Sequence, residues 1–344
     1  MRHLFVLAIL AGCTIGDEAD DDVRIDDIQT WDDLGPQPHV ACQDALPTID
    51  ADAPIFVNYG PYRAASGKPS RVDSPQTLSL TAPGERVITL RRPSVNCVRS
   101  VAELGPWIAG GGLVAHTMTI EDLNTVLADG TSAQHVAKLL RSGYAYVAID
   151  EIAFGNTGWR NGGVQVARFA KLATDLAAMG LDRRLIIYIN SYNLAGILGQ
   201  YSAVLATARD HARIIGSEIY VHTSDVEHAR ASPSGHCNRA TSCFEQIAAE
   251  MGAAAPNINY RTVTVLGVSD EYNQGAPDAL CNGGALQDQY AALHAGAHTR
   301  LQPGVGAYTL ARIERDQHPS WGAAEHAACK RRLDAWAAWP RARP

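Results

Sequence analysis

The sequence lacks a long apolar segment and an excess of positive charge. Its first apolar run, Leu4–Leu10, has seven residues, whereas a helix needs about 20 to cross the core of a bilayer. The net charge is −7, and residues 34–344 contain 27 acidic and 27 basic side chains. Because nucleic-acid-binding proteins carry a basic patch, we predict no nucleic-acid partner.

The motifs that hold common cofactors and metal ions are also missing. No G-x-G-x-x-G follows a predicted strand, H-E-x-x-H is absent, and no two cysteines have C-x2-4-C spacing. We therefore predict neither a cofactor nor a metal ion. The segment 267–271 begins like the G-x-S-x-G turn of esterases but lacks the final glycine. A serine esterase that uses Ser269 with His116 or His222 is a minor alternative.

Length and composition indicate a folded globular protein. The chain has 344 residues, of which 46% are hydrophobic and 19% charged, which excludes collagen-like, coiled-coil and wholly disordered classes. Most single cores stop growing at about 250 residues, although α/β barrels of this length fold as one domain.

The first 13 residues have the pattern of an export signal. A short basic start precedes the apolar run, and Leu10-Ala11-Gly12-Cys13 places small residues before a cysteine. This segment resembles a bacterial lipoprotein signal, in which the cysteine is acylated before cleavage. The resemblance implies a signal peptide at 1–12, a membrane anchor through lipid on Cys13, and a location in the bacterial cell envelope, on the periplasmic or cell-surface side. The alternative is an ordinary secretory signal with an incidental cysteine.

An acidic segment follows this cysteine. Residues 14–33 contain nine acidic side chains and one basic one, Arg24. Such a segment buries too little apolar surface to offset the entropy of ordering. We therefore predict a disordered tether at 13–40 and a folded domain at 41–344.

Six cysteines remain when Cys13 is set aside. An even number in an exported chain indicates three disulfides, for which 15 pairings are possible. Proximity in the sequence favours Cys237–Cys243, and we expect Cys42–Cys97 and Cys281–Cys329 as the other two.

The folded part alternates between strand and helix patterns. Apolar and β-branched runs predict eight strands, at 55–59, 86–90, 113–118, 144–152, 185–190, 214–222, 262–270 and 305–310. Helical patterns lie at 120–141, 163–179, 193–211, 239–253, 284–297 and 322–337. Eight such units favour a closed (β/α)8 barrel of the α/β class, a single disulfide-containing domain. The second strand is the least certain element, because the Pro-, Ser- and Gly-rich segment 61–96 also fits a hairpin.

Acidic residues end three of the predicted strands. They are Asp150 and Glu151 on the fourth, Glu218 on the sixth and Glu271 on the seventh. In a (β/α)8 barrel the active site gathers at these C-terminal ends. Alternation along the strands turns Asp150 and Glu218 toward the barrel axis. For each acid alone, an ion pair with an arginine or a helix cap is the alternative.

Aromatic side chains gather at the same ends. Seven of the twelve tyrosines lie there: Tyr59, Tyr62, Tyr188, Tyr192, Tyr220, Tyr272 and Tyr308. Paired carboxylates suit glycoside hydrolysis, and flat rings with a polar edge stack on sugars. The predicted substrate-binding residues are Tyr59, His116, Trp159, Tyr188, Asn190, Tyr220 and Tyr308.

Two short segments resemble secreted TIM-barrel glycoside hydrolases. Residues 148–152, Ala-Ile-Asp-Glu-Ile, look like the place where several of these families keep an acid/base, and 269–272, Ser-Asp-Glu-Tyr, are similar to the nucleophile strand of the large retaining clan. The resemblance implies that Glu151 is the general acid/base, that Glu271 or Glu218 is its partner, and that Asp150 tunes the acid. The chain has Asp150 where that clan has Asn, and it lacks the D-x-D-x-E run of chitinases.

The sequence therefore predicts a tethered, cofactor-independent hydrolase that acts on a carbohydrate polymer or oligosaccharide. The alternative is a catalytically silent barrel lipoprotein that binds a glycan or a protein partner at the same end of the barrel, because one fold hosts many functions.

Overall fold

The computed structural model describes residues 53–62, 84–90, 97–98, 104–150, 157–219, 243–267 and 292–308, together with Leu46, Ile152, Gln289 and Ala324. All of them belong to the second of two compact units, which spans His39–Pro344. The predicted signal peptide at 1–12, the lipidated Cys13 and the tether at 13–40 lie outside the described residues, so they stay predictions.

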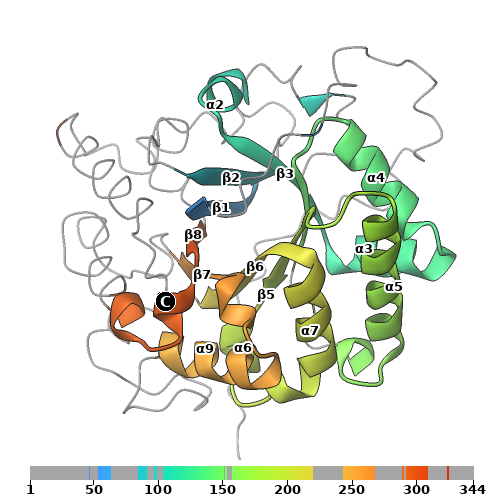
Figure 1. Cartoon of the computed structure of the whole chain (residues 1–344). Coiled ribbons are helices and arrows are strands. Elements are labelled where there is room, and N and C mark those ends of the chain that lie inside the picture. Colours follow the sequence, from blue (N-terminus) through green and yellow to red (C-terminus); the bar gives the residue numbers. More distant parts are fainter. Residues whose placement is uncertain are drawn as a thin grey trace, which may run out of the picture. The chain divides into compact units, whose positions relative to one another are not determined.

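Eight parallel strands form a closed barrel in chain order (Figure 1). They are β1 (Ile55–Tyr62), β2 (Glu85–Leu90), β3 (Leu113–Met118), β4 (Tyr146–Ile149), β5 (Leu185–Ile189), β6 (Ala212–Ile219), β7 (Thr262–Gly267) and β8 (Gly304–Tyr308). Each lies at a predicted strand, which confirms the (β/α)8 architecture. Because β2 pairs in parallel with β1 and β3, it belongs to the barrel and not to a hairpin.

Helices lie on the outside of this ring of strands (Figure 1). The α-helices are α2 (Gly105–Ala109), α3 (Ile120–Asp129), α4 (Ser132–Arg141), α5 (Val164–Ala178), α6 (Ser191–Leu194), α7 (Ser202–His211) and α9 (Cys243–Ala254). Short 3₁₀ turns are η7 (Thr157–Trp159), η8 (Leu198–Tyr201), η9 (Ile258–Tyr260) and η10 (Thr299–Leu301). The single helical pattern predicted at 120–141 is two helices, because Gly130 takes a left-handed φ of 78° and ends α3.

Side chains alternate along the strands between the barrel interior and the helix layer. Tyr146 and Ala148 of β4 pack in the interior cluster with Val57 and Val265, as the alternation of the fourth strand predicts. On the outer side, Val114 of β3 packs in a separate cluster with residues of α2. The interior is therefore a filled core, and any site must lie at one of its two ends.

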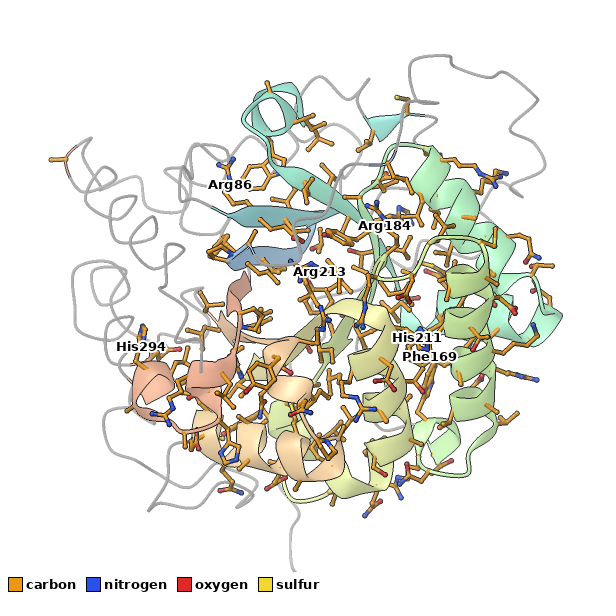
Figure 2. All side chains as sticks on the ribbon, in the orientation of Figure 1. Arg86, Phe169, Arg184, His211, Arg213 and His294 are labelled. Atoms are coloured by element: carbon orange, nitrogen blue, oxygen red, sulfur yellow. The ribbon has the colours of Figure 1, made fainter. Side chains whose placement is uncertain are left out.

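A buried ion pair occupies the N-terminal end of the barrel. Arg213, at the start of β6, donates to Glu85 Oε2 of β2 from Nη2 at 2.9 Å and from Nε at 3.3 Å. The Tyr146 hydroxyl donates to the other oxygen, Oε1 of Glu85. Figure 2 shows Arg213 inside the ring of strands. Glu85 and Arg213 neutralise each other's charge and are almost fully buried. Paired side chains therefore fill this end of the barrel interior.

The predicted disulfide pairs stay untested. Cys97 and Cys243 are each disulfide-bonded, but no two cysteines are joined within the described residues. Cys42, Cys237, Cys281 and Cys329 all lie outside them. Among the helices of the described ranges, none has the length and apolar character required to cross a membrane.

Candidate functional site

Alternation along the strands places five polar residues at the C-terminal end of the barrel interior, and we call them the polar layer. They are Thr89 of β2, Thr117 of β3, Asp150 just after β4, Tyr188 of β5 and Glu218 of β6. Four of them are at most 2% exposed, whereas Asp150 is partly exposed. The layer therefore lies directly on the apolar core and reaches the surface through Asp150.

The backbone explains why Asp150 belongs to this layer. Its N–H donates to the carbonyl of Met118 at 2.9 Å, which continues the pairing of β3 with β4 by one residue. The period of two along a strand then turns the Asp150 side chain to the same side as Tyr146 and Ala148. Both of those side chains lie in the interior cluster.

A glycine makes room for Tyr188. Gly216 of β6 is the register partner of Tyr188 on β5. A Cβ at Gly216 would lie 2.3 Å from Cδ1 and 2.6 Å from Cε1 of the tyrosine ring. The Tyr188 ring therefore lies against the bare backbone of β6. Glu218 is two residues further along the same face of β6, toward the C-terminal end of the barrel.

Glu218 is the most unusual member of the layer. Its side chain is 1% exposed, and a buried carboxylate is costly unless its surroundings compensate it. Buried acids near a second carboxylate are typical of catalytic sites, although ion-pair networks also contain them. Here Glu218 lies at the C-terminal end, whereas the acid of the core ion pair, Glu85, lies at the other end.

The electrostatics show that both acids are close to the phenol of Tyr188. Burial raises the pKa of Tyr188 well above its usual value, and the negative charges of Glu218 and then Asp150 raise it further. Thr89, on β2, acts in the opposite direction on that pKa. Burial and the two carboxylates therefore both favour the neutral phenol.

Asn190 and two strand-end tyrosines lie near the same end. Asn190 follows β5, is partly exposed, and caps α6 by accepting from the Asn193 N–H at 3.4 Å. Tyr59 and Tyr308 are register partners at the C-terminal ends of β1 and β8, but their side chains are not among those described. These positions agree with a role in binding, which stays a prediction.

Two predicted substrate-binding residues do not face this site. His116 shares the outer face of β3 with Val114, and its ring lies 5.2 Å from that of Tyr144 in the layer between barrel and helices. Burial, followed by the nearby His135, lowers its pKa to about 4. His116 therefore belongs to the helix layer and not to the polar layer, and its role in binding substrate stays a prediction.

Trp159 is also a packing residue. Its side chain in η7 has no exposed surface, and its ring meets that of Phe169 on α5 edge-on with 5.8 Å between centroids. The ring has no exposed face on which a sugar could stack, so its role in binding stays a prediction that this packing does not support. Tyr188 is likewise 0% exposed and does not offer a face to a polymer.

Other predicted residues lie outside the described part of the chain. These are the candidate acids Glu151 and Glu271 and the candidate binding residue Tyr220. Conversely, the sequence analysis missed Thr89 and Thr117, which alternation along β2 and β3 places on the same face as Val87 and Ala115. Within the described ranges, no three His, Cys, Asp or Glu side chains are grouped as metal ligands.

No family model matches the sequence, and no curated protein matches it either. Among solved structures, the chain is similar to a GH18 chitinase from Pseudoalteromonas aurantia, with a TM-score of 0.50, 9% identity, and coverage of 80% of this chain and 99% of that one. This likeness shows the fold: a barrel of the kind that a glycoside hydrolase uses.

Two further structures are similar at lower scores. One is an endo-beta-N-acetylglucosaminidase from Cordyceps militaris, with a TM-score of 0.48, 13% identity, and 83% of this chain and 90% of that chain covered. The other is a glucosidase from Croceicoccus marinus, with a TM-score of 0.46, 13% identity, and 84% of this chain and 68% of that chain covered.

Proposed function

We propose that this protein is a carbohydrate-active hydrolase that uses paired carboxylates at the C-terminal end of its barrel. The observation that carries the proposal is the polar layer, in which a fully buried acid, Glu218, and a partly exposed acid, Asp150, both interact with Tyr188. The barrel fold shared with a chitinase is compatible with this chemistry, but a fold alone does not choose an activity.

Two carboxylates can divide the work of hydrolysing a glycosidic bond. One protonates the leaving oxygen, and the other attacks the sugar or activates a water molecule. In our proposal Glu151, next to Asp150 in the sequence, is the general acid/base, and Glu218 or Glu271 is its partner. Asp150, adjacent to the acid, favours its protonated form because two negative charges close together repel each other.

The two strands that carry Asp150 and Glu218 are spaced suitably for a pair of carboxylates. β4 and β6 flank β5, so the strands that carry Asp150 and Glu218 lie about 10 Å apart at the backbone. Because both side chains are directed toward the barrel axis, the distance between their carboxyls is shorter than the distance between the two backbones. The required distances between carboxyls are about 5–5.5 Å for retention and about 6.5–9.5 Å for inversion.

We extend the proposal to the location and the covalent structure. Residues 1–12 act as a signal peptide, Cys13 carries the lipid that anchors the protein in the envelope, and residues 13–40 separate the anchor from the barrel. Three disulfides brace the folded domain. Incorporation of a labelled fatty acid by the wild type, and its loss in Cys13→Ser, tests the anchor; equal labelling of both refutes it.

The hydrolytic function is tested on a panel of polysaccharides with purified full-length protein. Wild type is compared with Glu151→Gln and with the control Asp175→Asn, which alters an exposed acid paired with Lys171 on α5. We expect reducing ends from the wild type and the control but not from Glu151→Gln. Activity of Glu151→Gln equal to the wild type removes Glu151 from the mechanism. Binding of a glycan without hydrolysis by the wild type favours the silent barrel instead.

A further inference from the structure

Tyr188 has a place in the site that the proposed hydrolysis does not account for. It is 0% exposed, so it cannot touch a polymer. Its ring nevertheless lies at the level of the polar layer. It fits there because Gly216 has no Cβ; a Cβ at that position would lie 2.3 Å from a carbon of the ring. A large polar side chain in this position requires a reason other than substrate contact.

The surroundings of its hydroxyl suggest that reason. β5 lies between β4 and β6, so Tyr188 lies between the strand that leads to Asp150 and the strand that carries Glu218. Thr89, from β2, is also close enough to act on the pKa of the phenol, which it lowers. The ring is packed against Gly216, and its hydroxyl thus lies at a place where two carboxylates act on it.

Few other charges face the interior of the barrel. Among the described residues, Glu85 of β2 and Arg213 of β6 are also interior, and they pair with each other at the N-terminal end. β7 presents Val263 and Val265 to the interior, and β1 presents Ile55 and Val57. Asp150 and Glu218 are therefore the described acids at the level of Tyr188.

We propose, given the proposed hydrolytic function, that Tyr188 is a positioning residue whose neutral hydroxyl stabilises the ionised form of the buried acid beside it without touching the substrate. In a low-dielectric interior, a fixed dipole near a carboxylate replaces part of the hydration that burial removes. A phenol that stays protonated supplies this dipole without adding a third negative charge.

The variant Tyr188→Phe isolates the hydroxyl, because it keeps the ring and therefore the packing. The loss of the dipole disfavours the ionised acid, so the acidic limb of the pH profile of kcat/KM moves to higher pH. We expect a three- to tenfold loss of kcat/KM below the optimum, with KM changed less than twofold. The control is Tyr144→Phe, which removes the hydroxyl of a tyrosine that is equally buried but lies in the outer cluster.

A second readout does not depend on activity. The carboxyls of full-length protein labelled with ¹³C in Asp and Glu are titrated by NMR in wild type and in Tyr188→Phe, and Glu218→Gln identifies the resonance of Glu218. We expect the Glu218 or Asp150 midpoint to rise in Tyr188→Phe and to stay in place in Tyr144→Phe.

The two readouts separate the two proposals. Unmoved carboxyl midpoints in Tyr188→Phe overturn the role of Tyr188, whether or not the protein hydrolyses a glycan. A raised midpoint in a protein that hydrolyses nothing supports the positioning by Tyr188 and overturns the hydrolytic function alone. An unmoved acidic limb in an active enzyme also overturns the role of Tyr188.

Discussion

The replacement Gly216→Ala tests the packing of the candidate site. The added Cβ would lie 2.3 Å and 2.6 Å from two carbons of the Tyr188 ring and 3.3 Å from Cγ2 of Val265. Neither neighbour is a flexible chain end, because both are fully buried in the interior cluster. Overpacking of this kind costs about 1–3 kcal/mol, so we expect the free energy of unfolding to fall by that amount.

The assay is urea unfolding, with Gly105→Ala as the matched control. A Cβ at Gly105, the first residue of α2, meets no atom within 4 Å, so this variant should be neutral or about 0.5–1 kcal/mol more stable. In the Gly216→Ala background, Tyr188→Phe keeps both ring carbons and gives no relief, whereas Tyr188→Val removes the clash. Equal midpoints for Gly216→Ala and Gly105→Ala would refute the described position of the ring.

Three further predictions concern stability, each measured by denaturant unfolding. Arg213→Met leaves Glu85 buried without its cation and should cost about 3–5 kcal/mol, whereas Arg209→Ala breaks an exposed pair and should cost at most about 1 kcal/mol; similar losses in the two variants contradict the buried pair. Because burial and then His135 lower the pKa of His116 from 6.5 to about 4, the unfolded state binds the extra proton in this interval. Wild type should therefore lose up to about 3 kcal/mol as the pH falls from 6.5 to 4, and His116→Phe should give a flatter curve; parallel curves sink this explanation. Thr119→Ala removes the cap that accepts from the Asp122 N–H at 3.1 Å and should cost about 1 kcal/mol, while Thr119→Ser should keep most of the stability; equal stability of the two variants argues against the cap.

The barrel was predictable because its strands are short apolar runs separated by helical patterns. Each run is bounded by turn residues, and eight of them in a chain of this length leave few other arrangements. The alternation of β4 was readable as well, since Asp150 marks one face and Val147 and Ile149 the other. The break between α3 and α4 depends on the left-handed backbone of Gly130. The apolar residues on both sides of Gly130 recur at helical spacing, so the pattern predicted one continuous helix.

The orientation of several side chains was not predictable from local pattern. Both faces of β3 are largely apolar, so a period of two does not reveal that His116 points to the helices. The burial of Trp159 depends on its contact with Phe169, and the pairing of Glu85 with Arg213 joins residues 128 positions apart. Such contacts follow from the closed barrel and leave no trace in the spacing of neighbouring residues.

The most direct test of the central claim, that the polar layer is the floor of a hydrolytic site, is the kcat/KM of Glu218→Gln on the polysaccharide that wild type cleaves. The amide keeps the size of the buried side chain, so the unfolding midpoint should change little. Because a positioned acid or base contributes about 10²–10⁴-fold, we expect a loss of at least about a hundredfold. A Glu218→Gln protein that folds and retains kcat/KM within about twofold of the wild type would contradict the account.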